Sequence, residues 1–593
     1  MESINLYRYY QRLLGLELGK EHAVTLGQVS EMLFASPRHT RSILKMMTEK
    51  RWISWLPRVG RNQRSTLIRA LSDDEVKRDV ASGWVKSSQY DKALEFLQHD
   101  QVAFGQLLQQ NAGAQVSEGK VRVQLTYNRS FTELSPRRPQ RNSERFLIRQ
   151  VHAGLVTLNE QGDVVADIAH HWEAEQNFHV WRFYLRPSVY FHNGGRVDAK
   201  AVSESLAYAQ SLPYFRNELD HVVSIEAVAE NTLEVTLTRQ DKGFAALLTD
   251  LKYSIEPRES LSSASSSTTK PVIGCGVFSL AEHTLEKMEL TANDRYHGLR
   301  ALTDQVSIWS LKKDLFSEES TSCNHSVTDS VGHEATPVIS HPELDYLADE
   351  GKSEGRTDSK ARIEHGCMFM IFNQRNTNLN HDQRRWLSQA LSGEQIWKQL
   401  QRDDQKFGAQ NATNFFPFWQ PIKRLSSNTV MLPDTLNIAF YHHPGITRGA
   451  KAMKRLLQQQ GVEVILHDYS FDEFIDKSFN QGFEEELVLS SLNLDDNYQV
   501  SALLFFLSDP VLHATIGDEL STWLIKEINQ IRANSEAKDY LTELEPFGSM
   551  LIHEGVISPM FHHRQTLSFE GVIKGVEITS WGWPQLRDVW SAG

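Results

Sequence analysis

Residues 36–69 constrain this chain more than any other segment, because a strongly basic stretch here combines a helix start with a hairpin pattern. Ser36 is a preferred N-cap residue and Pro37 suits the first helical position, so a helix should begin at this point. At 100° per residue, polar and basic side chains gather on one face of that helix, opposite three apolar ones. The polar face holds Arg38, His39, Arg41, Ser42 and Lys45, and the apolar face holds Ile43, Leu44 and Met47.

The runs 52–56 and 65–69 are rich in β-formers and flank a basic loop, which predicts a hairpin. Upstream, a T-x-x-Q capping box at residues 25–28 opens a short helix, and an earlier helix is expected over 4–16. Three helices followed by a hairpin make a winged helix-turn-helix, in which the second helix of the turn enters the major groove and the hairpin, or wing, meets the backbone. The predicted DNA contacts are Ser36, the polar face and the loop residues Arg58, Arg61, Asn62 and Arg64.

Charge favours nucleic acid over a winged helix that binds only protein. Residues 1–70 carry 12 Lys and Arg against 5 Asp and Glu, a net charge of +7. The whole chain has a net charge of −13, so residues 71–593 carry −20. Glu49 is the only acid between Ser36 and Arg69, whereas a solvated helix face normally mixes both signs. Attraction to DNA phosphates is the reading we favour for this end of the chain.

The length of 593 residues predicts several folding units in a multidomain α/β protein. The three cysteines, Cys275, Cys323 and Cys367, lack metal-ligand spacing and suggest a reducing compartment. Neither a secretory signal nor a membrane span is evident, so we expect a cytoplasmic protein that does not engage a membrane. Phosphate-binding loops, nucleophile elbows and metalloprotease motifs are missing, so no enzyme, cofactor or metal is expected.

Beyond a helical connector at 72–117, strands and helices alternate from residue 118 to the C-terminus. Residues 166–173 (ADIAHHWE) and 181–194 (WRFYLRPSVYFHNG) match two consecutive segments of one known family. In these segments the chain resembles the extracytoplasmic solute-binding proteins of oligopeptide, dipeptide and nickel transporters. The resemblance implies a bilobal, periplasmic-binding-protein-like domain over 118–593. Ser-rich and acidic stretches near 259–269 and 317–355 read as mobile loops within it.

Such a domain closes on a ligand held between its lobes, at strand ends and hinge crossings. Candidate ligand contacts follow strands or allow close backbone approach: Asn128, Gly274, Cys275, Gly276, Asn373, Arg375 and Asp495. A sugar phosphate would need an Arg fork or a helix N-terminus, whereas a peptide would need an acid for its amine. The sequence alone does not discriminate between these effectors.

A winged helix joined to a solute-binding module resembles the SgrR-type bacterial regulators of the sugar-phosphate stress response. The N-terminal resemblance rests on Ser36, Arg38, His39, Arg41, residues 52–55 and residues 59–65. It implies a transcription regulator that binds double-stranded DNA and senses a small metabolite, such as a sugar phosphate, a sugar or a peptide. The alternative is a solute-binding component for peptide or sugar uptake whose N-terminal domain is an interaction module; that function would require export.

Overall fold

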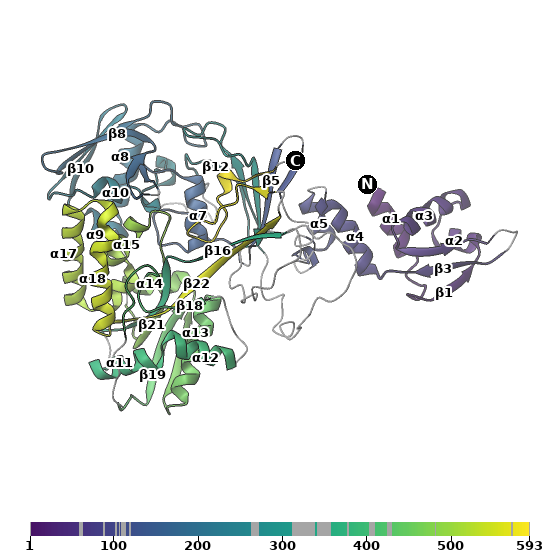
Figure 1. Cartoon of the computed structure of the whole chain (residues 1–593). Helices are drawn as coiled ribbons and strands as arrows, with labels where there is room; N and C mark the ends of the chain where they lie inside the picture. The colour runs from purple at the N-terminus through teal and green to yellow at the C-terminus, as the bar shows by residue number, and fades with distance from the viewer. Residues whose placement is uncertain are drawn as a thin grey trace. The chain divides into compact units, whose positions relative to one another are not determined.

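The computed structural model of the chain divides into two compact units, one formed by Met1–Gly113 and one by Ala114–Ser310 and Ile339–Gly593 (Figure 1). Most of the loops predicted at 259–269 and 317–355 lie outside the described residues. The structure describes residues 1–593 except 1, 59–62, 87–88, 101–102, 106, 108–113, 118–119, 128, 160, 262–271, 311–338, 341–356, 376–378, 403–408, 424–429, 481, 571–572 and 592–593.

The first unit is the predicted winged helix-turn-helix followed by further helices. Its elements are α1 (Glu2–Gln11), β1 (Glu21–Val24), α2 (Leu26–Met32), α3 (Pro37–Glu49), β2 (Ile53–Leu56), β3 (Ser65–Arg69), α4 (Asp73–Lys86) and α5 (Tyr90–Phe96). The predicted capping box opens α2, and the predicted hairpin pairs β2 with β3. Strand β1, which is not predicted from the sequence, pairs with β3 and makes the sheet three-stranded.

Helix α1 ends at Gln11, five residues before the predicted end at residue 16. The cause is Arg69, which is only 7% exposed and reaches back from β3. Its Nη1 donates to the carbonyls of Leu14 (3.2 Å) and Leu16 (2.7 Å), which holds this stretch in a turn. A distant strand therefore overrides the local helical periodicity.

Helices α4 and α5, within the predicted connector, pack into the core of the winged helix. Val76 and Val80 of α4 are buried in the same cluster as Leu44 and Trp52. The Trp52 indole donates to Asp79 at 2.9 Å, and the Tyr7 hydroxyl donates to Asp73 at 2.9 Å. The structure thus groups the described part of 72–113 with the winged helix-turn-helix.

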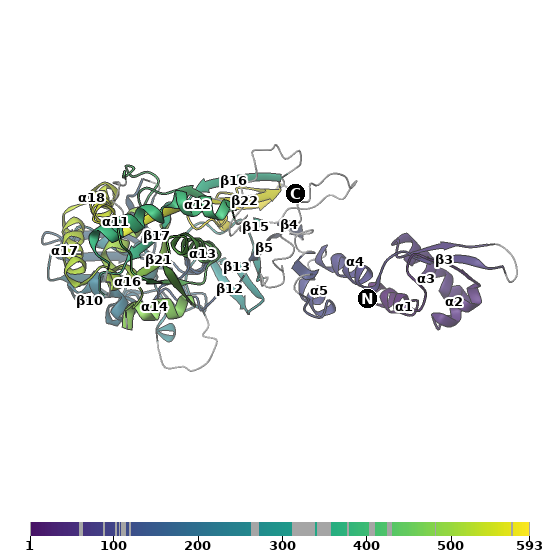
Figure 2. The same ribbon diagram turned by 90° about the horizontal axis from the view of Figure 1, so that it is seen from below.

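The second unit is bilobal, as predicted, and one strand joins its two halves. In the large sheet the strand order is β12-β13-β14-β5-β15-β22-β17-β21-β19-β20, and β22 (Ile557–Glu570) belongs to both halves. Its first residues pair with β17 (Gly366–Phe372), and its last seven pair with β16 (Thr357–Ile363), the neighbour visible in Figure 2. The lobes are therefore coupled through continuous backbone pairing.

The first lobe also carries a four-stranded sheet of order β10-β11-β9-β8, with α8 nearby at one end of the unit (Figure 1). The remaining elements of this lobe are β4 (Ala114–Ser117), β5 (Lys120–Tyr127), α7 (Asn142–Val151), β6 (Val156–Leu158), β7 (Val164–Ala166), β8 (Ala169–Glu175), β9 (Val180–Leu185), α8 (Ala199–Ser211), α9 (Arg216–Leu219), β10 (Val222–Ala229), β11 (Thr232–Leu237), α10 (Phe244–Leu247), β12 (Phe278–His283), β13 (Lys287–Ala292), β14 (Gln305–Ser310), β15 (Ile339–Ser340), β23 (Ile573–Lys574) and β24 (Trp590–Ser591).

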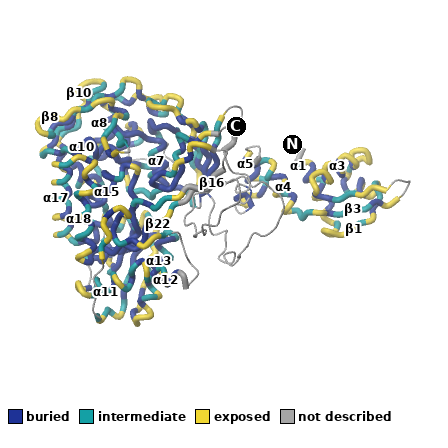
Figure 3. Tube along the Cα trace, viewed as in Figure 1, coloured by how far each residue is buried: buried dark blue, intermediate teal, exposed yellow. Residues whose placement is uncertain are grey.

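The second lobe packs helices around β17, β21, β19 and β20. Its other elements are α11 (His381–Ala390), α12 (Gly393–Arg402), β18 (Ala409–Asn411), β19 (Thr435–Tyr441), α13 (Pro444–Gln458), β20 (Glu463–Tyr469), α14 (Phe471–Asn480), β21 (Leu487–Asn493), α15 (Tyr498–Ser508), α16 (Pro510–Thr515), α17 (Asp518–Asn534) and α18 (Tyr540–His553). Buried residues follow the sheet strands, and exposed ones follow the outer loops (Figure 3). Among the helices that the structure describes, none is long and apolar enough to cross a bilayer.

Candidate DNA-binding surface and solute cavity

Helix α3 presents the predicted polar face to solvent. The Ser36 hydroxyl accepts a hydrogen bond from the His39 backbone N–H at 3.4 Å, and Pro37 occupies the first turn, so the helix starts where the sequence predicts. Thr40, Ile43, Leu44 and Met47 are buried and anchor the opposite side. The predicted side chains Arg38, His39, Arg41, Ser42 and Lys45 are all exposed, and this outer side of α3 is drawn in yellow in Figure 3.

The arginines of this face keep their charge available. Neither Arg38 nor Arg41 forms an ion pair with a described residue, whereas Lys45 lies 3.8 Å from Glu49 in an exposed pair. Exposed pairs of this kind contribute little, so Lys45 also remains able to exchange partners. On the hairpin, Arg58 and Arg64 are exposed. The predicted contacts Arg61 and Asn62 lie outside the described residues.

A cavity of about 290 Å³ lies in the second unit. Residues from both lobes line it, including Tyr127 of β5, the start of α7, Tyr441 of β19, and Phe471 and Phe474 of α14. Its charge balance is the reverse of that of the whole chain. Six cationic side chains line it, Arg129, Arg138, Arg141, Arg145, Lys252 and Arg564, against three carboxylates, Asp250, Glu364 and Asp509.

The three carboxylates already have partners. The Glu364 carboxylate accepts from the His563 ring at 2.7 Å; burial alone would raise its pKa, but His563 lowers it overall. Asp250 accepts from the Lys252 backbone N–H at 3.0 Å. Asp509 accepts from the Leu512 N–H at 2.8 Å, and burial raises its pKa to about 6. The cavity carboxylates are therefore engaged in hydrogen bonds within the protein, and little of their negative charge is available to a ligand.

Among the cations that line the cavity, Arg141 forms no ion pair with a described carboxylate. It is the N-cap residue of α7, and its guanidinium stacks over the Phe471 ring, 5.1 Å from the ring centre. Its buried Nε has no hydrogen-bond partner among the described atoms. Burial, and then the neighbouring Arg129, lower its pKa, so the site would gain from a bound anion. The partial positive charge of the α7 N-terminus lies at the same place.

Arg145, one turn further along α7, is held in place. It forms an ion pair with Asp495, which is fully buried and also accepts from the Trp581 indole at 3.0 Å. Asp495, a predicted ligand contact, is not part of the cavity lining. It positions Arg145 and Trp581, and both of these side chains line the cavity.

The other predicted ligand residues that the structure describes do not line this cavity. Gly274, Cys275 and Gly276 pack against the end of α7, where the Gly276 N–H donates to the Val151 carbonyl at 2.8 Å. Asn373 is fully buried and its Nδ2 donates to two backbone carbonyls. Arg375 forms an ion pair with Asp518. Asn128 lies outside the described residues. Arg141, Arg145 and Phe471, which do line the cavity, are not among the residues predicted from the sequence, although Arg141 and Arg145 stand four apart at a helix start.

Comparison with known proteins agrees with this two-part architecture. Residues 5–119 match the family described as sugar transport-related sRNA regulator, N-terminal, and residues 163–424 match bacterial extracellular solute-binding proteins, family 5, middle. The HTH-type transcriptional regulator SgrR of Photorhabdus laumondii is 26% identical over 100% of this chain and 99% of its own length. The chain belongs to the SgrR family of transcriptional regulators.

Further SgrR relatives cover the chain equally well, among them that of Yersinia enterocolitica, 26% identical over 98% of this chain and 97% of its own length. These relatives are transcriptional regulators and not enzymes. Solved structures support the fold of the second unit in this SgrR-family chain. The murein tripeptide-binding protein MppA of Escherichia coli has a TM-score of 0.61 at 16% identity, covering 80% of this chain and 99% of its own. The oligopeptide-binding protein AppA of Bacillus subtilis, solved with a nonapeptide, has a TM-score of 0.63 at 13% identity. The match covers 80% of this chain and 99% of AppA.

Proposed function

We propose that the first unit binds double-stranded DNA through α3 and the hairpin, and that the cavity of the second unit binds a small anionic effector, with sugar phosphates as the favoured class. The observation that carries the effector half is Arg141, a half-buried cation of the cavity that pairs with no described carboxylate. Four other cations of the lining, Arg129, Arg138, Arg145 and Lys252, already form ion pairs within the protein. Acting on DNA, the protein would work in the cytoplasm.

For DNA, the exposed face of α3 would enter the major groove. Arg38 and Arg41 can donate two hydrogen bonds to a guanine edge, and His39, Ser42 and Lys45 can contact neighbouring bases or phosphates. Ser36, at the start of α3, lies at the groove edge in this arrangement. The wing residues Arg58, Arg61, Asn62 and Arg64 would hold the backbone, which fixes register without reading sequence.

For the effector, a phosphate group suits Arg141 and the N-terminal N–H groups of α7. The rings of Phe471 and Tyr441 offer apolar faces to a sugar. A cavity of about 290 Å³ is near the lower end of the range for small-molecule sites, which favours a compact solute over an extended peptide. The cavity carboxylates are engaged, which also disfavours recognition of a peptide amine.

Replacing Arg141 with glutamine should weaken effector binding by about ten-fold or more, because a hydrogen bond to a charged group contributes about 1.5–3 kcal/mol. The measurement is a thermal-shift titration of the full chain with glucose 6-phosphate, with glucose and a tripeptide as comparison solutes. At 100 times its dissociation constant a ligand adds about 2.7 kcal/mol, which is readily detected.

Arg375→Gln is the matched control, since Arg375 is an arginine of the same unit that the cavity does not include. We expect it to bind glucose 6-phosphate as the wild type does. Binding lost in Arg375→Gln and kept in Arg141→Gln would instead favour the site predicted from the strand ends.

A further inference from the structure

A cluster of aromatic and basic side chains adjoins the N-terminal end of α3, outside the surface that the sequence predicts for DNA. Arg12, which follows α1, is exposed, and its guanidinium lies 5.1 Å from the centre of the Tyr9 ring and 5.3 Å from that of Phe34. Its Nη1 donates to the Leu33 carbonyl at the end of α2. Two rings and one carbonyl thus fix an arginine that belongs to neither α2 nor α3.

The same cluster is continuous with the polar face of α3. The Tyr9 hydroxyl lies 3.3 Å from Nε2 of His39, and the two rings meet edge to face. His39 sits beside Arg38 in the first turn of α3, so Arg12 is coupled through Tyr9 to the end of the helix that would enter the groove.

The charge of Arg12 is uncompensated within the described part of the chain. Its only polar contact there is to a carbonyl, and no carboxylate pairs with it. By contrast, Lys20, Lys50 and Lys77 of the same unit each have an acidic partner. A guanidinium has five N–H donors, so most of those of Arg12 remain able to bind an anion.

Phe34 is held in a backbone conformation that its side chain disfavours. It lies in the turn between α2 and α3 with φ of +49°, and its side chain is 83% exposed. A left-handed turn position after a helix is usually glycine, and a bulky residue there is strained. Since exposure removes any packing gain in a core, the ring's visible role is its contact with Arg12.

We propose that Arg12 is a DNA phosphate contact, preorganised by Tyr9 and Phe34 beside the N-terminus of α3. Fixing the guanidinium before binding reduces the entropy lost when it grips a phosphate. Tyr9 and Phe34 act as positioning residues, and the contact adds affinity without reading sequence. This inference rests on the proposed DNA-binding function of the first unit.

The test is the salt dependence of binding by the full chain to a duplex that the wild type selects from a random pool. Each phosphate contact contributes about 0.9 to the slope of log affinity against log salt concentration. Arg12→Gln should therefore reduce the slope by about one and weaken binding several-fold. Arg78→Gln on α4, an exposed arginine of the same unit, removes the same charge and should leave the slope unchanged.

Phe34→Gly separates positioning from folding. Glycine relieves the strain at φ +49°, so the Tm of the first unit should stay the same or rise. DNA affinity should nevertheless fall, because the ring that holds Arg12 is gone. A merely structural Phe34 would move Tm and affinity in the same direction.

The possible failures are distinguishable. If Arg12→Gln keeps the wild-type slope while Arg41→Gln lowers it, the proposed phosphate contact of Arg12 is overturned and DNA binding by α3 stands. If the wild type enriches no duplex from the pool, the proposed DNA-binding function fails, and the proposed phosphate contact of Arg12 fails with it.

Discussion

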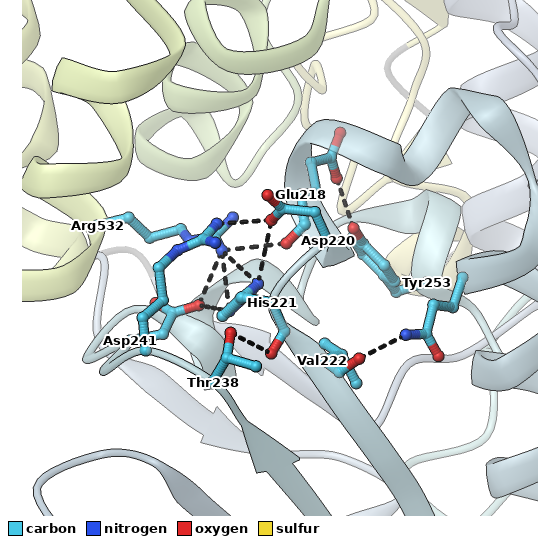
Figure 4. A network of polar contacts seen from close by, with 10 residues as sticks. Glu218, Asp220, His221, Val222, Thr238, Asp241, Tyr253 and Arg532 are labelled. Atoms are coloured by element: carbon cyan, nitrogen blue, oxygen red, sulfur yellow. Dashed lines mark hydrogen bonds and ion pairs between the residues drawn. The ribbon is translucent and has the colours of Figure 1, made fainter.

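Replacing Arg532 with methionine should destabilise the second unit by about 3–5 kcal/mol, because removing one member of a buried ion pair leaves the other charge without compensation. Arg532, on α17, is 2% exposed, and its Nη2 lies 3.0 Å from the Asp241 carboxylate (Figure 4). The same nitrogen donates to the Glu218 carbonyl at 3.0 Å, and the buried His221 ring also contacts Asp241 at 3.0 Å. The network ties α17 to the lobe that carries the four-stranded sheet.

The change would be measured as the shift of the second unit's calorimetric transition, since a chain of two units need not unfold in one step. The double variant Asp241→Asn, Arg532→Met removes both charges and should lose less stability than the sum of the single variants. Strictly additive losses would show that the two groups do not interact. Asn534→Ala, an exposed change two residues away on α17, should have a small effect.

Replacing both Arg38 and Arg41 with alanine should lower DNA affinity by about 100-fold or more, because each bidentate contact to a base contributes about 1–3 kcal/mol. Both side chains are exposed without an ionic partner among the described residues, so the fold should be unaffected. Fluorescence anisotropy with a selected duplex gives the affinity, and the thermal transition checks the fold.

The control for this change is the double variant Lys77→Ala, Arg78→Ala on α4, which removes two positive charges from the same unit. It should change affinity only slightly. If both double variants weaken binding equally, net charge and not the face of α3 determines affinity.

The helix-turn-helix could be predicted from sequence because its signals are local. Ser36 caps α3 through a residue three positions away, and the hairpin follows directly from adjacent β-rich runs. The end of α1 could not be predicted, because it depends on Arg69, more than 50 residues away. The coupling of Arg12 to Phe34 is equally non-local.

The residues that line the cavity are harder to predict from the sequence, for a physical reason. Residues after buried strands were expected to contact ligand, yet Asn373 uses its amide to satisfy backbone carbonyls of its own lobe. Helix starts from different parts of the chain line the cavity instead, with Arg141 and Phe471 brought together from 330 residues apart. Asp495, another predicted ligand contact, is fully buried and neutralises Arg145, and it does not line the cavity.

The proposed function implies that an anion in the cavity changes DNA binding by the first unit, and one titration tests this directly. The full chain and its Arg141→Gln variant would be titrated against a selected duplex, with saturating glucose 6-phosphate or with glucose. Allosteric coupling of typical size predicts a change in wild-type DNA affinity of about five-fold or more with the phosphate ester, none with glucose, and none in the variant. Unchanged wild-type affinity, under conditions where the thermal shift shows glucose 6-phosphate bound, would contradict the account.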